Sequence, residues 1–178
     1  MNASNIKFAR PKVSGVFYSA AVTATAPTSA SAALGDAFSD MGYVSEDGIV
    51  QSLDRSVTKL KDMGGEVVAV WDETHDLTYT LTPLEINDSV LGEIYGADNV
   101  TASTITINAD ALPDRMYVFD MRLSDTSLLR VVVPHGHISN TGDITFKKGT
   151  TIDCELEITA MPDSSGNKAY YYRAAASN

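Results

Sequence analysis

The sequence predicts a mainly β protein, with a β-sandwich-like or barrel-like fold and one short flanking α-helix at about residues 88–95. Two observations carry this prediction. Apolar and polar residues alternate with a period of two in segment after segment, as they do in strands that bury one face. Helical spacing of apolar residues is almost absent after Phe38, and turn-forming pairs such as Gly64-Gly65 and Pro113-Asp114 separate the alternating segments.

Length and charge limit the possible functions. At 178 residues and 44% hydrophobic content, the chain fits a single domain that can bury a core without disulfides. It carries 13 basic and 23 acidic side chains, and its formal net charge is −10. An acidic surface releases no counterions from a phosphate backbone, so this balance argues against a protein that reads nucleic-acid sequence.

The N-terminal part has a different composition from the rest. We expect residues 1–37 to form a strand or arm followed by a connector, and residues 38–178 to form a single β domain. Residues 20–35 are rich in Ala, Thr and Ser around Pro27, which is typical of an extended connector. The stretch 13–26 lacks Leu and contains several Ser and Thr, so a strand and loop are favoured over a secretory signal. No apolar run approaches the length of about 18 residues that a membrane-spanning helix needs.

Three segments show the strand alternation most clearly. In residues 152–160, apolar residues alternate with acidic ones and with Thr159, which predicts one core face and one solvated face. Residues 76–82 and 117–123 follow the same pattern. Weaker patterns predict further strands at 13–20, 49–60, 66–71, 102–108, 128–134, 143–147 and 168–174.

The single predicted helix has signals at both ends. Asn87 or Asp88 can cap its N-terminus, and Gly96 is suited to end it. Between them, an apolar stripe at helical spacing indicates one buried side. The stripe consists of Val90, Leu91, Ile94 and Tyr95.

Few residues in the sequence indicate a catalytic or metal-binding site. His135 and His137 are one residue apart and could bind a metal with His75 as a third ligand. No Cys pair and no clustered carboxylates accompany them, and His75 shares the alternation of Leu77, so a solvated turn at 135–137 and a packed His75 are favoured. Cys154 alternates with core residues and is expected to be a small buried hydrophobe. We therefore predict no enzyme activity, no metal and no cofactor.

Two further sequence features have a structural and a functional interpretation. The segment 163–166 is typical of a turn, because a nucleophile elbow needs a Gly two residues before the Ser. The aromatic run 170–172 could stack on a sugar or a base. Burial of these tyrosines against the sheet or the next subunit is the favoured interpretation.

Several segments together resemble the major tail tube proteins of long-tailed, siphovirus-type bacteriophages. None is specific by itself, and their order, spacing and combination carry the resemblance, which covers about residues 42–166. The segments are Gly42–Ile49 followed by Ser52–Arg55, then Thr80–Glu85 leading through Asn87 into the helix, and finally Val131–Pro134, Glu155–Met161 and Pro162–Gly166.

The resemblance implies a structural protein of the virion tail. In that family six subunits form a ring, and rings stack into a tube around a tape measure protein, between a tail terminator and the tail tip. Double-stranded DNA would pass through the tube without sequence-specific binding, and no membrane would be involved. A secreted or virion-surface β-sandwich binding module is the alternative from another class. A subunit of a contractile-injection tube is a nearer alternative.

The resemblance also suggests contact residues. A long strand pair near residues 45–66 reaches the neighbouring ring in that family, and an ordinary solvated hairpin is the alternative here. The expected inter-ring or subunit contacts are Leu53, Asp54, Arg55, Val57, Lys59 and Lys61. An acidic channel would repel DNA and let it slide. The acidic face of the 152–160 strand therefore makes Asp153, Glu155 and Glu157 candidates for the channel wall, with a plain outer surface as the alternative.

Overall fold

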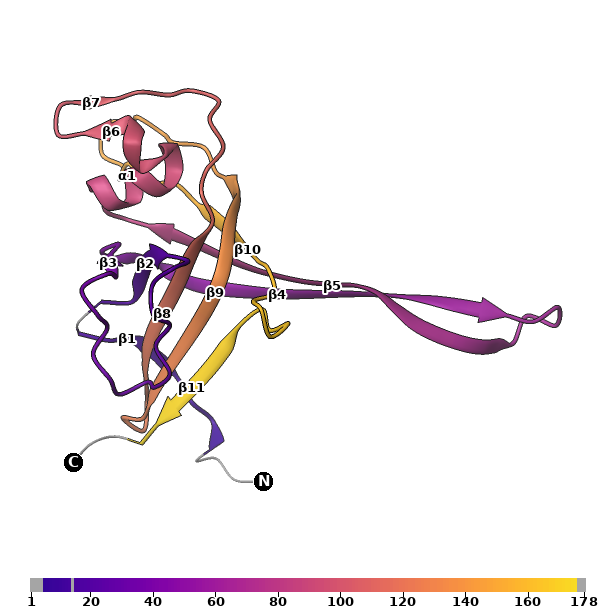
Figure 1. Ribbon diagram of the computed structural model, residues 1–178. Coiled ribbons are helices and arrows are strands. Elements are labelled where there is room, and N and C mark those ends of the chain that lie inside the picture. The colour runs from indigo at the N-terminus through magenta and orange to yellow at the C-terminus, as the bar shows by residue number, and fades with distance from the viewer. Residues whose placement is uncertain (1–4, 14, 176–178) are drawn as a thin grey trace.

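Most strands of the protein join one large antiparallel sheet (Figure 1). The computed structural model describes residues 5–13 and 15–175, so residues 1–4 and 14 of the predicted N-terminal segment and residues 176–178 of the predicted domain lie outside the described residues. Within the described residues the sheet has nine strands in the order β3-β2-β8-β9-β10-β5-β4, with β1 beside β8 and β11 beside β9. Their bounds are β1 Ala9–Pro11, β2 Phe17–Ala21, β3 Ser39–Asp40, β4 Val44–Lys61, β5 Val67–Pro83, β8 Arg115–Leu123, β9 Leu128–Thr141, β10 Leu156–Ala160 and β11 Tyr170–Ala174.

Between β5 and β8, outside the sheet, lie one helix, a short 3-10 turn and a minor strand pair. These are α1 Asp88–Tyr95, η2 Ala97–Asn99, β6 Val100–Thr101 and β7 Thr104–Ile105. The predicted mainly β fold with one short helix is confirmed. Asn87 caps α1, because its side-chain oxygen accepts a hydrogen bond from the Val90 backbone N–H at 2.9 Å. Gly96 ends the helix at a φ of 87°, a conformation that favours glycine. None of the described helices is long and apolar enough to cross a membrane.

Some predicted strands differ from those observed. The predicted strands 66–71 and 76–82 are parts of the continuous β5, because pairing with β4 carries the strand through the polar residues between them. Residues 143–147 form no strand, although Ile144 packs against the core. A strand also needs hydrogen bonds to a neighbouring strand, and burial of one side chain does not provide them. Similarly, β10 begins at Leu156 rather than at Ile152.

The core lies on both faces of the central strands. On one face, the rings of Phe17 and Phe119 stack with centroids 5.6 Å apart, and the Tyr79 ring packs against Phe119 in a tilted arrangement at 5.2 Å. Leu156, Ile158 and the helix residue Val90 complete this main cluster. On the opposite face a smaller cluster contains Tyr18, Met116, Val118 and Val132. Ala26, Leu34 and Phe38 pack against this smaller cluster, so the Ala/Thr/Ser-rich connector covers the second face of the sheet.

Candidate assembly surface

The feature that leaves the body of the protein is the hairpin of β4 and β5. The two strands pair from Val44↔Pro83 to Lys61↔Val67, but only the end of β5 from Leu77 to Pro83 alternates between buried and half-buried side chains. The outer part of the hairpin, residues 53–76, is called the arm. Figure 1 shows it projecting away from the rest of the chain. Its tip is a built turn: the Asp62 carboxylate accepts hydrogen bonds from the N–H groups of Gly64 and Glu66, each at 2.9 Å. The arm is therefore an ordered element that makes few contacts with its own chain.

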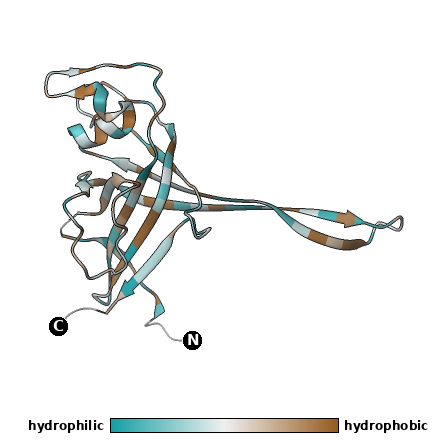
Figure 2. Cartoon of the chain, viewed as in Figure 1, coloured by the Kyte–Doolittle hydropathy of each residue, from teal (hydrophilic) through white to brown (hydrophobic). Residues whose placement is uncertain are grey.

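The arm exposes many large apolar side chains. Met63 at the tip is fully exposed, and Trp71 and Val68 keep 49% and 60% of their surface accessible. Figure 2 shows hydrophobic colour on both strands near the end of the arm. The complete set is Leu53, Val57, Leu60, Met63, Val67, Val68, Val70 and Trp71. An exposed apolar patch of this kind, on a long strand pair, marks a surface that a partner covers.

The predicted contact residues are divided between the two faces of the arm. The extra residues at both register shifts fall on β5, so side chains of β4 alternate without interruption. All the predicted contact residues except Asp54 therefore share one face, where Arg55, Lys59 and Lys61 stand among apolar neighbours. Within the described residues no ion pair engages any of these three cations. This face of the arm thus carries three cations and one acid, Asp72, which pairs with Val57, so it is net positive although the chain as a whole is acidic.

The candidate channel residues lie close together in sequence but on different kinds of structure. Asp153 and Glu155 precede β10, and only Glu157 belongs to the strand. Asp153 accepts a hydrogen bond from the Thr151 hydroxyl at 2.6 Å, and Glu157 accepts one from the Ser139 hydroxyl at 2.9 Å. Glu157 lies between two buried neighbours, so its side chain is on the face opposite the main core. Their assignment to the channel stays a prediction.

The structure corrects the predicted environment of the histidines. Residues 135–137 are part of β9 rather than a turn, and His75 is exposed on the arm rather than packed. His135 Nε2 and His137 Nδ1 form hydrogen bonds with the two carboxylate oxygens of Asp114, at 2.9 and 2.8 Å. His75 instead contributes its backbone carbonyl, which accepts a hydrogen bond from the Lys168 ammonium. In the part of the chain that the structure describes, no group of three His, Cys, Asp or Glu side chains could hold a metal ion.

The two histidine contacts lower the pKa of Asp114. The hydrogen bond from His135 is the largest cause, and the hydrogen bond from His137 adds to it while burial acts in the opposite direction. A carboxyl group with a lowered folded pKa stabilises the fold above its ordinary pKa of about 3.9, and this contribution is lost as the pH falls through the folded pKa.

Asp114→Asn should therefore lower the free energy of unfolding near pH 6, and the gap from the wild-type protein should shrink below about pH 4. Denaturant titrations at a series of pH values measure this gap. Asp36→Asn is the matched control, because Asp36 is an exposed carboxylate for which no histidine contact exists among the described residues. A gap that stays constant down to pH 3 would contradict the assignment.

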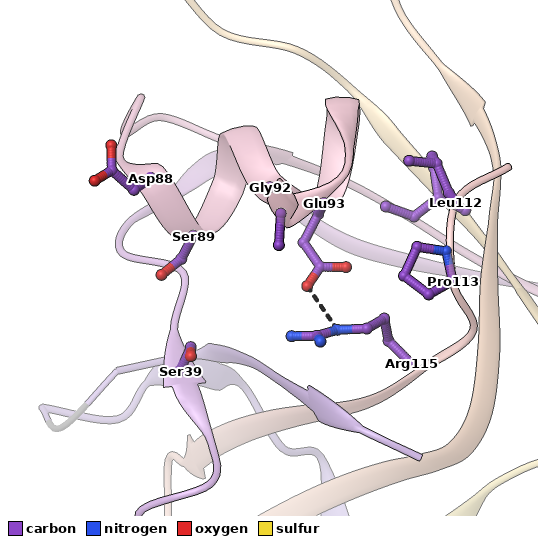
Figure 3. Close-up of a pocket in the computed structure, with 10 residues that line it drawn as sticks. Ser39, Asp88, Ser89, Gly92, Glu93, Leu112, Pro113 and Arg115 are labelled. Atoms are coloured by element: carbon purple, nitrogen blue, oxygen red, sulfur yellow. Dashed lines mark hydrogen bonds and ion pairs between the residues drawn. The ribbon is translucent and has the colours of Figure 1, made fainter. Parts of the chain in front are cut away.

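A buried acid connects α1 to the sheet. Glu93 is 6% exposed, and Figure 3 shows its side chain pointing from the helix toward Arg115. One carboxylate oxygen accepts hydrogen bonds from the Ser19 hydroxyl at 2.5 Å and from Arg115 Nε at 3.0 Å. The other accepts one from the Tyr117 hydroxyl at 2.9 Å. Burial first, and the Glu93 charge second, raise the pKa of Tyr117. One feature of the sequence could have predicted the burial of Glu93: it lies three residues after Val90, on the buried side of the helix.

The cavity beside Glu93 is small and polar on several sides. It has a volume of about 240 Å³ and lies between α1, β3 and the segment that leads into β8. Figure 3 shows Ser39, Ser89 and Pro113 around it. Glu93 and Arg115 form an ion pair at this cavity, and the pair fixes the helix against the sheet.

A second buried ion pair holds the connector. Arg130 is 0% exposed and binds the Asp120 carboxylate through two hydrogen bonds, at 2.6 and 2.7 Å. Its remaining terminal nitrogen donates to the backbone carbonyls of Ser29 and Ala32, at 2.8 and 3.0 Å. The Lys12 ammonium also contacts the Asp120 carboxylate, at 3.1 Å. Sequence reasoning placed Asp120 on a solvated face, and the connector buries that face instead.

Cys154 and the tyrosine run agree with their structural interpretations. Cys154 is 5% exposed, burial raises the pKa of its thiol, and the sulfur donates to the Gly142 carbonyl. Tyr170 and Tyr172 stack with ring centroids 6.2 Å apart and pack against the smaller core cluster. Tyr171 points to the other face, where its hydroxyl contacts Tyr79 and Gln51.

Comparison with known proteins identifies the family. The model of a family described as phage tail tube protein matches residues 2–177. Among solved structures, the chain is similar to the tube terminating cap of the anti-feeding prophage, at 9% identity and a TM-score of 0.48 with 93% of each chain covered. It is also similar to a chain of the PVC sheath-tube complex of an extracellular contractile injection system, at 8% identity and a TM-score of 0.46 with 93% of each chain covered. No curated protein matches the chain. From the family match, which spans almost the whole sequence, the chain belongs to the phage tail tube proteins and is a structural, non-enzymatic component of the virion tail.

Proposed function

We propose that this subunit closes into six-membered rings, and that the arm stacks these rings into the tube of a siphovirus-type tail. The observation that carries the proposal is the arm itself, which is ordered at its turn and exposes apolar side chains that its own chain does not cover. The arm and the surface that receives it are different parts of the molecule. Such a head-to-tail contact can be repeated from copy to copy, and it builds an open stack where successive copies do not close into a ring.

Within a ring, the free sheet edges are the candidate contacts between subunits. β3 and β4 are the terminal strands of the sheet path, and their outer backbone groups have no strand partner among the described residues. Closing a ring covers such edges and removes the risk of uncontrolled pairing. Ring closure through these edges is consistent with the predicted barrel-like inner wall.

The channel and the other partners follow from the same proposal. We assign Asp153, Glu155 and Glu157 to the channel wall, where their carboxylates would repel DNA and let it slide. The net charge of the whole subunit, −10, has the same sign. The tube would surround a tape measure protein and end at a tail terminator and a tail tip. Double-stranded DNA would pass through it without sequence-specific binding.

Electron microscopy of the concentrated full-length chain tests the proposal, with light scattering to give its mass in solution. We expect hollow tubes with sixfold end views. A solution that stays monomeric at every concentration would contradict assembly by this chain alone.

A shortened arm tests the role of the hairpin. Val57 pairs with Asp72, so replacing residues 58–71 with an Asn-Gly turn preserves the ladder below this pair. Rings should remain and tubes should disappear. Phe146→Ser is the control, because it removes a side chain that is 80% exposed and lies outside the arm. Normal tubes from the shortened variant would refute the role of the arm.

A further inference from the structure

A groove on the body of the protein has the properties that a receiving surface for the arm needs. It lies between β1 and the first residues of β4 and has a volume of about 440 Å³. Its walls are mainly apolar. They include Ala9, Pro11, Val16, Val44, Ile49 and Met121. Val44, Ile49 and Met121 pack against the main core as partly buried side chains, so the floor of the groove is continuous with the core.

The backbone on both sides of the groove explains why it stays open. On one side, β1 pairs only with β8, so its other edge is free within the described residues. On the other side, the ladder between β4 and β5 passes directly from Val44↔Pro83 to Ile49↔Leu81, so residues 45–48 bulge out of the sheet. Gly48 permits this bulge with a φ of 74°. A free strand edge facing a bulged strand is a suitable seat for extended chain from a partner.

The rim of the groove is acidic. Glu46 and Asp47 are exposed, and no ion pair involves either of them among the described residues. Arg10 also lines the groove and is a cation there. The cationic face of the arm, with Lys59 and Lys61 near the tip, is complementary to this acidic rim. Potentials of opposite sign select the partner and its orientation as the two surfaces approach.

We propose that the tip of the arm, residues 59–68, docks in this groove on a second copy of the chain. Met63 at the turn and Val67, which pairs with Lys61 and shares its face, would cover the apolar walls, and Lys59 and Lys61 would lie against Glu46 and Asp47. Figure 1 shows the arm tip far from β1, so the arm cannot fill the groove of its own chain. This inference rests on the proposed stacking role of the arm and names the surface on which that role depends.

Charge reversal on each side tests the contact. The double variants Lys59→Glu/Lys61→Glu and Glu46→Lys/Asp47→Lys should each lose tubes, and the quadruple variant that combines them should regain tubes. Lys147→Glu/Lys148→Glu is the matched control, because these two lysines are exposed in a loop outside the arm and the groove. Thermal unfolding checks that each variant is folded.

The outcomes separate the two proposals. Loss of tubes from the arm variant, together with normal tubes from the groove variant, would overturn the groove as the docking site and leave the arm's role intact. Normal tubes from both variants would overturn the proposed charge contact, and the shortened arm then decides separately whether the arm stacks the rings. Loss from both without recovery in the quadruple variant would contradict direct pairing of these charges.

Crosslinking provides a second measurement that does not depend on images of tubes. Tyr43 is 75% exposed at the groove, and Met63 is fully exposed at the arm tip. After oxidation, full-length Met63→Cys/Tyr43→Cys should give a ladder of linked chains, because a disulfide needs Cα atoms within about 7 Å. Met63→Cys/Phe146→Cys should give no ladder, and the native Cys154 is buried. The reverse result would overturn the proposal.

Discussion

Arg130→Ala is expected to destabilise the protein by about 3–5 kcal/mol, a large part of the stability of an ordinary domain. The variant leaves Asp120 charged at 2% exposure, with Lys12 as its only remaining ion-pair partner among the described residues. It also removes the donor to the carbonyls of Ser29 and Ala32, so the connector loses its attachment to the sheet. Denaturant unfolding measures the loss, and elastase digestion should cut the Ala-rich connector faster than in the wild-type protein.

Two variants make the result for Arg130 interpretable. Arg122→Ala removes an exposed arginine from the neighbouring strand β8 and should change stability by no more than about 0.5 kcal/mol. Arg130→Met/Asp120→Leu removes both charges and should recover much of the lost stability, because a buried ion pair can be replaced by apolar side chains of similar size. Equal stability of Arg130→Ala and Arg122→Ala would show that the pair does not hold the connector.

The helix shows what sequence alone predicts well. The signals that define it are local: the Asn87 side chain caps the first turn and Gly96 ends the last one. Both act through backbone hydrogen bonds and φ angles within a few residues, so the bounds 88–95 were predictable. The strands at 152–160 and 143–147 were harder. Ile144 and the apolar residues from Cys154 to Ala160 pack inward, while Phe146 and Ile152 are exposed, because the extent of a strand depends on a partner that lies elsewhere in the chain.

The position of the connector could not be predicted from the sequence. Its Ala, Thr and Ser residues carry no strong periodicity, so nothing in the sequence indicates which surface it covers. The structure places it over the smaller cluster, where Ala30 is 2% exposed. Small side chains allow the backbone to approach Arg130 closely enough for its carbonyls to accept hydrogen bonds. Asp120 therefore follows the alternation correctly but is buried, because alternation predicts the face of a strand and not what covers that face.

The arm was predictable in a different way. Its contact residues came from a resemblance to a family, and alternation along β4 then divides them between two faces. The acidic groove was missed, because it depends on β1 and the bulge at 45–48 lying together. Residues 9–11 and 45–48 carry no pattern that relates one to the other.

Glu93→Ala is expected to cost about 2–4 kcal/mol of unfolding free energy, although alanine is the better helix former. The loss arises because Glu93 accepts three hydrogen bonds that hold α1 against the sheet. Without it, the Ser19 hydroxyl and the Tyr117 hydroxyl lose a buried acceptor, and Arg115 loses its ion pair. Denaturant unfolding measures the effect, with Glu73→Ala on the exposed arm as the control. Equal unfolding free energies for the two variants would contradict this role.

Comparing Glu93→Ala with the arm variants separates effects on folding from effects on assembly. Glu93 is buried and belongs to neither the arm nor the groove, so at temperatures where Glu93→Ala remains folded it should form tubes at the wild-type concentration. Arm variants should behave in the reverse manner, because the arm makes few contacts with its own chain: unfolding free energy should be unchanged and tubes should be lost. A Glu93→Ala protein that is folded by unfolding measurements but forms no tubes would show that α1 takes part in assembly, and the surface around α1 would then have to be added to the subunit contact.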